Sequence, residues 1–248
     1  DYEWDAAFDA LKKLEEETGT VLEDSPTINV SSDDTQGLKE PHEFPALSLA
    51  KTKKVTDLVK WASDRPIFLS WKLDGLTLVV TYDNGKLTKV VTRGDGHIGT
   101  NITHLAGAIQ GIQKTVKEKG HLVIRGEAVI SYEDFEQFVL ESGEDYANPR
   151  NLASGSLSLK DSEEVKRRNI HWIPFTLVYT EKKIVSWGEQ MQYLSDLGFT
   201  VVDHEVIQNP SYENISGVID AWTKKVTSHL NPYPVDGLVI TYDDTQYA

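Results

Sequence analysis

Lys72 stands where a lysine side chain could act as a nucleophile. It follows an apolar stretch at residues 66–71, begins the tetrapeptide KLDG, and precedes a strand-like run at residues 76–82. At the end of a strand, beside an Asp-Gly turn, a lysine can be partly desolvated, which favours the neutral amine over the ammonium ion. The tetrapeptide alone is weak evidence, because an exposed lysine beside a turn is the more common arrangement.

Several short, charged motifs follow Lys72 along the chain. They are TRGDG at residues 92–96, VIRGE at 123–127, ANPRN at 147–151 and PVDGLVI at 234–240. Each is expected at the edge of a strand, where a rigid scaffold can hold charged side chains over one site. One lysine, several arginines and two or three carboxylates suit a nucleotide phosphate with a metal ion. The ordered set therefore favours a nucleotide-binding enzyme over an incidental surface lysine.

In this order the motifs resemble those of the adenylation domain of bacterial NAD+-dependent DNA ligases. The resemblance includes DSPT at residues 24–27 and HEFPALSL at 42–49, so it covers nearly the whole chain. It implies an α+β nucleotidyltransferase fold, in which antiparallel sheets flanked by helices hold the nucleotide between them. Residues 1–37 would be a partial helical subdomain for nicotinamide mononucleotide (NMN), followed by a linker. Residues 38–248 would be the adenylation domain, within which the RGD tripeptide is not a cell-adhesion signal.

The resemblance implies a covalent mechanism centred on Lys72. The lysine would attack the adenylyl phosphorus of NAD+, release NMN and form lysyl-AMP, with Mg2+ as the accompanying metal ion. The AMP would pass later to a 5′-phosphate at a DNA nick, as DNA replication and repair require. Asp74 would orient the lysine or act in that later step, although an ordinary turn-former before Gly75 would look the same.

The family's nucleotide-binding positions correspond here to Ser48, Leu49, Ser70, Leu73, Arg93, Glu127, Arg150, Phe175, Asp236 and Thr241. By resemblance, Arg93 contacts the nucleotide or its ribose, Glu127 the ribose hydroxyls and Arg150 a phosphate. The resemblance also implies that Asp236 lies near the lysine or the metal ion. It further implies that Phe175 stacks on adenine and that Ser48 and Leu49 line the adenine pocket. Core packing of Phe175 or Leu49 stays an alternative.

The first residues of the chain resemble the family's D-x-E-Y-D motif, which contacts the NMN half of NAD+. The matching residues are Asp1, Tyr2, Trp4 and Asp5. Trp4 replaces the tyrosine and could still stack on the nicotinamide ring. Asp1 and Asp5 are four residues apart and therefore share one face of a helix. An ordinary acidic helix start would have the same composition.

Three residues depart from the family's pattern. Ser70 stands where the family has glutamate, Ser158 where it has arginine and Thr241 where it has lysine. The chain also ends before the family's last nucleotidyl-transfer motif and lacks the upstream Tyr-His pair, so it is interpreted as a truncated, divergent member. Lost polar groups can weaken transition-state stabilisation. A relative that binds an adenine nucleotide or a partner without sealing DNA is therefore the first alternative.

A second alternative is another lysyl-nucleotidyl transferase, such as an ATP-dependent ligase or a capping-type enzyme. The ANPRN segment and the acidic N-terminal pattern argue against it.

The elements that must position these residues follow from periodicity and cap signals. Helices are expected at residues 1–18, 56–63, 132–142, 186–197 and 212–230, and strands at 121–130, 170–179 and 237–242. Three further strands are expected over 67–92, with a hairpin at Asn84-Gly85. Residues 19–40 resemble a linker, and residues 102–112 a helix or an irregular crossover. Ser131 is the expected cap of the helix at 132–142. The absence of strict β-α-β alternation favours an α+β fold.

Amino-acid composition limits the number of domains, the membrane topology and the cellular compartment that we expect for the protein. The 248 residues, 39% of them hydrophobic, suit one large domain or one and a half. We expect no membrane span and no secretory leader, because no run of about 18 apolar residues and no basic, apolar-cored start occurs. The sequence has no cysteine, which excludes disulfides and thiolate zinc sites and agrees with a cytoplasmic protein.

The net charge of −14 argues against strong DNA binding by this chain alone, because phosphate contacts need clustered lysine and arginine. In the family that the chain resembles, much of the contact with DNA belongs to later domains. We therefore expect a monomer that binds NAD+ or AMP itself, and nicked double-stranded DNA mainly through domains outside this chain.

Overall fold

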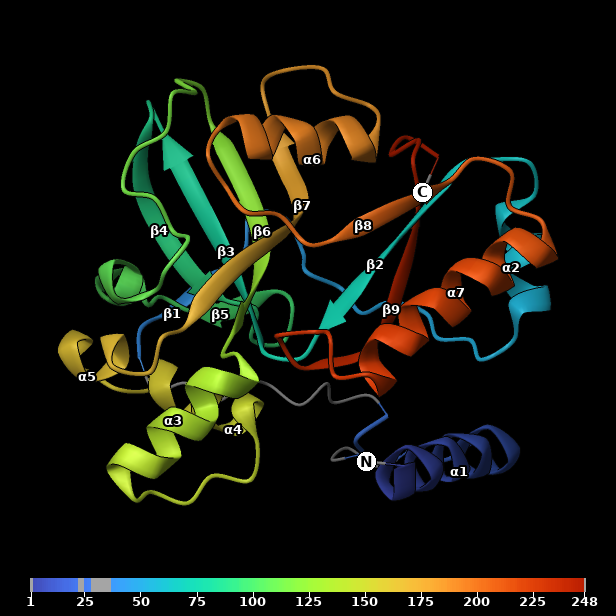
Figure 1. The fold of residues 1–248 in the computed structure, drawn as a ribbon, viewed down its shortest axis with the longest axis horizontal. Coiled ribbons are helices and arrows are strands. Elements are labelled where there is room, and N and C mark those ends of the chain that lie inside the picture. Colours follow the sequence, from blue (N-terminus) through green and yellow to red (C-terminus); the bar gives the residue numbers. More distant parts are fainter. Residues whose placement is uncertain (1, 22–24, 28–36, 248) are drawn as a thin grey trace.

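The structure is a computed structural model that describes residues 2–21, 25–27 and 37–247, with residues 2–5 described by their backbone alone (Figure 1). Its helices are α1 (Tyr2–Thr18), α2 (Val55–Ala62), η1 (a 3-10 helix, Thr103–Ala108), α3 (Tyr132–Ser142), α4 (Pro149–Leu157), α5 (Ser162–Lys166), α6 (Trp187–Asp196) and α7 (Tyr212–Thr227). Its strands are β1 (Lys39–Pro41), β2 (Ile67–Leu73), β3 (Leu76–Asp83), β4 (Lys86–Thr92), β5 (Ile98–Thr100), β6 (Leu122–Val129), β7 (His171–Thr180), β8 (His204–Ile207) and β9 (Val235–Tyr242). This mixture of helices and sheets confirms the predicted α+β class.

The strands form two main sheets that lie side by side (Figure 1). The large sheet has the strand order β4-β3-β6-β7, and the small sheet has the order β8-β2-β9. A short third sheet pairs β1 with β5, and every named strand pair is antiparallel. Helices α2 and α7 pack beside the small sheet, and α3, α4 and α5 gather at one end of the large sheet (Figure 1).

The KLDG tetrapeptide is the point at which the chain passes from the small sheet to the large sheet. Strand β2 pairs with β8 and β9, whereas β3, which begins at Leu76, pairs with β4 and β6. Gly75 lies in the connection, where a Cβ atom would be 2.0 Å from the carbonyl oxygen of Ala128. Only glycine allows two backbones to approach so closely. The crossing therefore places Lys72 and Asp74 at the junction of the two sheets.

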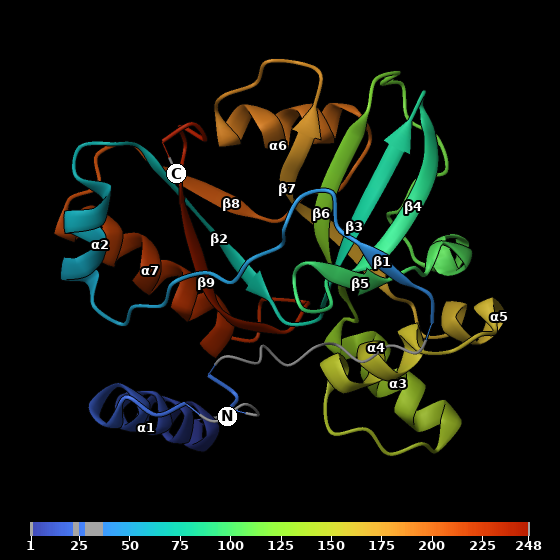
Figure 2. The ribbon, with the colours of Figure 1, turned by 180° about the vertical axis from the view of Figure 1, so that it is seen from behind.

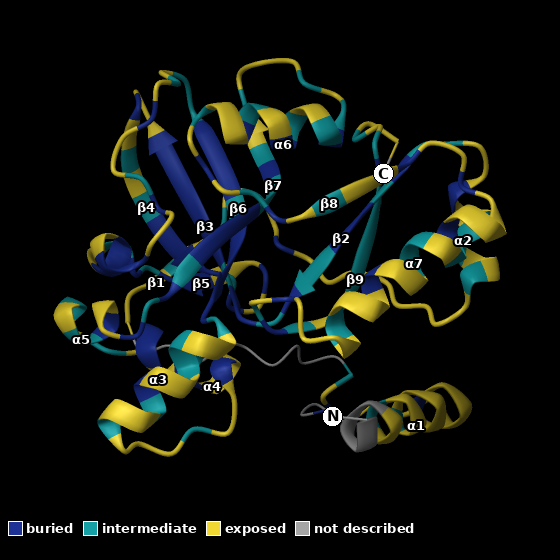
Figure 3. Cartoon of the chain, viewed as in Figure 1, coloured by how far each residue is buried: buried dark blue, intermediate teal, exposed yellow. Residues whose placement is uncertain are grey.

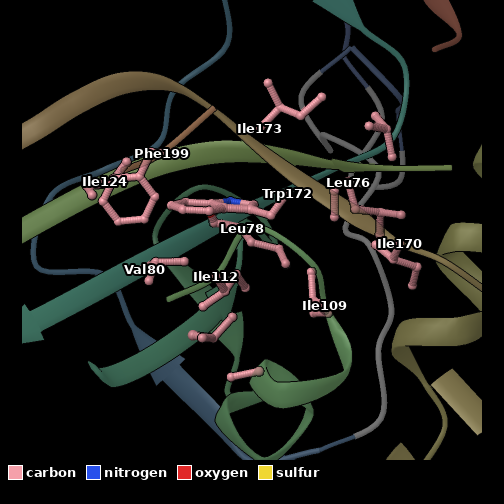
Figure 4. Close-up of a cluster of buried hydrophobic side chains, with 14 of the residues drawn as sticks. Leu76, Leu78, Val80, Ile109, Ile112, Ile124, Ile170, Trp172, Ile173 and Phe199 are labelled. Atoms are coloured by element: carbon pink, nitrogen blue, oxygen red, sulfur yellow. The ribbon is translucent and has the colours of Figure 1, made fainter. Parts of the chain in front are cut away.

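The main core lies against one face of the large sheet. Buried residues concentrate there, whereas the described part of α1 is mostly exposed (Figure 3). Trp172 lies within this core and meets Phe199 edge to face, with 5.9 Å between the ring centres (Figure 4). Its indole N–H donates to the carbonyl oxygen of Leu78 at 3.2 Å, so its polar atom is satisfied. A second cluster, which includes Ile67 and Ile215, joins the small sheet to α2 and α7.

Most elements expected from the sequence are confirmed. The helices around residues 56–63, 132–142, 186–197 and 212–230 correspond to α2, α3, α6 and α7. The three strands over 67–92 are β2, β3 and β4, and Asn84 and Gly85 both have the positive φ of a tight hairpin, at 49° and 75°. Residues 102–112 contain a 3-10 helix and no α-helix, which agrees with two glycines in that stretch. Strand β1 begins at Lys39, inside the segment expected to be a linker.

Ser131 caps helix α3 as expected, and its removal should have a measurable cost. Its side-chain oxygen accepts a hydrogen bond from the backbone N–H of Asp134 at 3.0 Å. We expect Ser131→Ala to lower the free energy of unfolding by about 1 kcal/mol, because that N–H loses its partner. Urea unfolding measures this change, and Ser131→Asn, which can still cap, should restore the stability. An equal loss in both variants would contradict the capping role.

Within the described residues, no helix is both long and apolar enough to cross a lipid bilayer.

Candidate functional site

Lys72 lies at the end of β2, where its ammonium group is paired with Asp236. Lys72 Nζ donates to Asp236 Oδ1 at 2.8 Å and to Oδ2 at 2.7 Å. The two residues are 164 positions apart in the sequence and come together because β2 pairs with β9, with Lys72 opposite Gly237. Their side chains are 43% and 41% exposed, so both remain open to a ligand. A partly exposed pair of this kind contributes at most about 1 kcal/mol to stability.

Asp74 pairs with Arg150 beside Lys72. Arg150 Nη1 donates to Asp74 Oδ1 at 2.9 Å, which joins the KLDG and ANPRN motifs. The sequence interpretation placed ANPRN at the edge of a strand, and that was wrong, because the motif begins helix α4. Asn148 caps this helix by accepting from Asn151 N at 2.9 Å, and Pro149 occupies its first turn. Asparagine followed by proline is a typical helix start, and it directs Arg150 toward Asp74.

Glu127 is a buried carboxylate behind this pair. It lies opposite Thr77 in the β3–β6 register. Its Oε1 accepts from the Gly75 backbone N–H at 3.2 Å, and its Oε2 accepts from Thr77 Oγ1 at 2.8 Å. Burial raises the pKa of Glu127 to about 7, although both hydrogen bonds and the positive charges of Arg150 and Lys72 lower it. Near neutral pH the carboxyl group therefore exists in both protonation states.

Arg93 and Arg125 hold the segment at residues 42–48, which we call the strap. Arg93 Nε donates to the carbonyl oxygen of Ala46 at 2.9 Å, and its Nη2 donates to Ser48 Oγ at 3.0 Å. Arg125 Nη2 donates to the carbonyl oxygen of Pro45 at 3.2 Å. Figure 2 shows the connection from β1 to α2, which contains the strap, running across the large sheet toward the small sheet.

Arg125 was not among the residues singled out from the sequence. Burial lowers its pKa, and the nearby charge of Arg93 lowers it further. Its Nε is buried without a hydrogen-bond partner in the described part of the chain. The signal that could have found it is its position two residues before Glu127, because alternate residues of a strand share one face.

Strand register places Ser70 and Thr241, which the resemblance marks as departures from the family pattern, on the same face of the small sheet as Lys72. Lys72 lies opposite Gly237, Ser70 opposite Val239, and Phe68 opposite Thr241. Ser70 is buried and Thr241 is half-buried. Because successive side chains in a strand point to opposite faces of the sheet, the side chains of Ser70 and Thr241 lie on the face that carries Lys72. The third divergent residue, Ser158, is an exposed residue at the end of α4.

The other expected residues are more scattered. Leu49 is 64% exposed, which excludes core packing for it. Phe175 is half-buried and packs against the main core, and Leu73 is buried within that core. Asp1 lies outside the described residues, as do the side chains of Tyr2, Trp4 and Asp5. The structure thus brings together Lys72, Asp74, Glu127, Arg150 and Asp236, with Arg93 and Ser48 joined at the strap.

The carboxylates at this junction suit a metal that is shared with a substrate phosphate. Among the described residues, no three histidine, aspartate or glutamate side chains are arranged to hold a metal ion by themselves. Mg2+ commonly takes one or two protein carboxylates and completes its shell with phosphate oxygens and water. Asp74 and Asp236 flank Lys72 and are 28% and 41% exposed, so this donor set fits such a partial site.

Comparison with known proteins identifies related sequences. Residues 39–248 match the family described as the NAD-dependent DNA ligase adenylation domain. A DNA ligase from Lachnoclostridium phytofermentans is 40% identical over 253 residues, which cover 100% of this chain and 38% of the relative. A DNA ligase from Ruminiclostridium cellulolyticum is 40% identical over 252 residues, which cover 99% of this chain and 38% of the relative. The chain therefore spans well under half the length of these relatives.

One solved structure supports the fold independently of close sequence similarity. An archaeal ATP-dependent RNA ligase superposes with a TM-score of 0.50 at 14% identity, over 82% of this chain and 46% of that one. At such low identity the likeness concerns the fold alone.

Proposed function

This chain belongs to the family of NAD-dependent DNA ligase adenylation domains, and from this premise we propose that it transfers the adenylyl group of NAD+ to Lys72. The observation that carries the proposal is the convergence of three other motifs on the KLDG motif that contains this lysine. Asp236 contacts it directly, Arg150 and Asp74 form a second ion pair beside it, and Glu127 lies behind them. Such a set of opposite charges can bind a phosphate and hold the nucleophile near it.

The covalent step needs a free amine on Lys72. The amine nitrogen attacks the adenylyl phosphorus, an N–P bond forms, and the P–O bond to NMN breaks. NMN leaves as its phosphate monoester, and the proton released from the amine passes to water. Lys72 is ion-paired with Asp236, and its amine must leave that contact and be deprotonated before it attacks. When bound, Mg2+ would neutralise phosphate charge, with Asp74 and Asp236 as the protein carboxylates that hold it.

The remaining residues of the site would bind and orient the nucleotide. Arg150 lies in the first turn of α4, where the helix dipole also favours an anion, so it suits a phosphate. Glu127 can accept hydrogen bonds from ribose hydroxyls when it is ionised. Arg93 donates a hydrogen bond to Ser48, which we propose lines the adenine pocket, and it would position that residue against the nucleotide. Ser48 and Leu49 would line the adenine pocket with Phe175. Asp1, Tyr2, Trp4 and Asp5 would contact the NMN half.

We further propose that AMP passes from Lys72 to the 5′-phosphate at a nick in double-stranded DNA. Support for this comes from the relatives named DNA ligase, of which this chain spans 38%. A weakened relative that binds a nucleotide without sealing DNA is the second candidate. The observation that favours it is that Ser70 and Thr241, which replace charged residues of the family pattern, share the Lys72 face of the small sheet.

Intact-mass spectrometry of the longest natural form of the protein tests the adenylation step. We expect a gain of one AMP after incubation with NAD+ and Mg2+, and no gain with ATP and Mg2+. A gain with ATP alone would overturn NAD+ as the donor. No gain with either, while calorimetry still detects AMP binding, would favour the weakened relative.

A further inference from the structure

His121 joins two carboxylates that belong to different parts of the chain. It immediately precedes β6, and its Nδ1 lies 2.6 Å from Asp83 Oδ1 at the end of β3. Its Nε2 lies 2.9 Å from Glu43 Oε2, on the strap. Neutral imidazole has one N–H, whereas the imidazolium ion has two. Only the protonated ring can therefore donate to both carboxylates at once.

Besides the hydrogen bonds from Arg93 and Arg125, two further groups of contacts among the described residues hold the strap against the large sheet, and the His121 contact belongs to the first of them. At the His121 end, Phe44 stacks on Tyr179 of β7, with ring centres 5.6 Å apart and planes inclined by 14°. The His121 ring also lies 5.3 Å from the Tyr179 ring. Glu43 and Phe44 together therefore fasten this end of the strap to the ends of three strands.

The second group of contacts involves the loop after β4. The backbone N–H of His42 donates to the carbonyl oxygen of His97 at 2.7 Å, and that of Ala46 donates to the carbonyl oxygen of Gly96 at 2.8 Å. From there the strap continues to Ser48, which Arg93 contacts. Pro45 and Ala46, whose carbonyl oxygens accept from Arg125 and Arg93, follow directly after Glu43 and Phe44 along the strap.

We propose that His121 is a positioning residue for the adenine nucleotide: its imidazolium clasps Glu43 to Asp83, holds the strap in place, and releases it on losing a proton. The nucleotide part of this inference rests on the proposed function, since it takes Ser48 and Leu49 to line the adenine pocket. The clasp itself rests on the geometry of His121, Glu43 and Asp83 alone.

The charged groups around His121 favour its cationic form. Besides Asp83 and Glu43, Glu181 accepts from the His121 backbone N–H at 3.3 Å. Lys89 acts on Asp83 from β4, and Glu118, from the preceding loop, is paired with Lys182 at 3.4 Å. The hydrogen bond to Asp83 raises the pKa of His121, burial lowers it, and the contact with Glu43 raises it further, with a net increase from 6.5.

This direction of the pKa shift determines whether the clasp is lost toward acidic or toward alkaline pH. A raised histidine pKa means that the folded protein binds the proton more tightly than the unfolded chain. The stabilisation is complete below about pH 6.5 and disappears as the pH rises through the higher folded value. The strap should therefore be held at mildly acidic pH and loosened at alkaline pH.

Hydrogen exchange of peptides that cover residues 41–49, without nucleotide, tests the clasp. At pH 6 we expect His121→Gln to exchange about fivefold faster than wild type, because glutamine carries no charge. At pH 8.5 wild type should exchange as fast as His121→Gln, whereas His121→Arg, which stays cationic, should remain protected at both pH values. His104→Gln, at an exposed histidine of η1, is the matched control. Equal protection of wild type and His121→Gln at pH 6 would overturn the clasp.

AMP affinity, measured by calorimetry on the same proteins, tests the link to the nucleotide. The ratio of wild-type to His121→Arg affinity should fall about fivefold between pH 6 and pH 8.5. Titration of Glu127 affects both proteins and cancels in this ratio. A constant ratio, together with the expected exchange result, would overturn the positioning role and leave only a structural clasp. Failure of wild type to bind AMP would overturn the proposed function, while the exchange result alone would still decide the clasp.

Discussion

Replacing Lys72 with alanine is expected to abolish the covalent AMP adduct. The substitution removes the attacking nitrogen, and no other lysine shares its place between Asp236 and the Asp74–Arg150 pair among the described residues. We expect the rate of adduct formation with NAD+ and Mg2+ to fall at least about a thousandfold, since loss of a nucleophile removes the covalent route. Intact mass after timed incubation measures the change. The protein should stay folded, because the partly exposed ion pair adds at most about 1 kcal/mol.

Two further variants distinguish a nucleophilic role of Lys72 from the effect of its positive charge alone. Lys89→Ala is the matched control, since Lys89 also holds a carboxylate, Glu40 at 3.1 Å, and is 40% exposed compared with 43% for Lys72. It should form the adduct at the wild-type rate. Lys72→Arg keeps a cation beside Asp236, but the guanidinium stays protonated and cannot attack. An adduct that survives in Lys72→Ala or Lys72→Arg would place the nucleophile elsewhere.

Glu127→Gln is expected to make the protein more stable and less active. Burial raises the pKa of Glu127 to about 7 from an ordinary value of 4.5, so the folded chain holds this proton more tightly than the unfolded chain. The stabilisation from the bound proton is present below about pH 4.5 and is lost as the pH rises through about 7. At pH 8 the wild type therefore keeps a buried charge, which glutamine avoids. We expect the variant to gain up to about 3 kcal/mol there in urea unfolding, and much less at pH 4.5.

Activity should change in the opposite direction. Glutamine can accept from Gly75 N–H or from Thr77, but it lacks the second carboxylate oxygen and the negative charge that we propose for the ribose hydroxyls. We expect adduct formation at pH 8 to fall about tenfold to a hundredfold. A variant that is less stable than wild type at pH 8 would contradict the cost of burying this carboxylate.

Glu118→Gln provides a control in which the expected change in stability at pH 8 is opposite to that of Glu127→Gln. Hydrogen bonds from Tyr193 and from the Gly120 backbone N–H, together with Lys182, lower the pKa of Glu118 to about 2. Its stabilisation is present above the ordinary value of 4.5 and is lost as the pH falls through about 2. This variant should therefore be less stable than wild type at pH 8, while its adenylation rate stays unchanged.

The local elements were predictable from the sequence because they depend on neighbouring residues. Ser131 indicates the start of α3 by its type and spacing, and Asn84-Gly85 indicates a hairpin because both residues tolerate positive φ. Short apolar runs rich in β-branched residues and separated by turn signals indicate β2, β3 and β4 in the same way. The family was recognisable for a related reason, since the motifs that carry it are short and occur in a specific order. The helix start at Asn148-Pro149 was equally local and was overlooked.

The arrangement of the site depended on contacts between distant residues. Nothing near Lys72 in the sequence indicates that β2 pairs with β9 and β8 while the next strand joins another sheet. That choice depends on which apolar faces are buried together, and it decides that Lys72 meets Asp236. Strand pairing between distant segments also explains three other features of the site. They are the burial of Glu127, the position of Arg125 beneath the strap and the contact of His121 with Glu43.

The sequence by itself therefore determined most of the helices and strands and the family, and it supplied the residues that we propose for the chemistry, because each depends on residue type and short spacing. Only the tertiary structure decided which charges are paired, which are buried and which hold the strap. Those properties arise from strand pairing across more than a hundred residues, where burial and register outweigh any local preference.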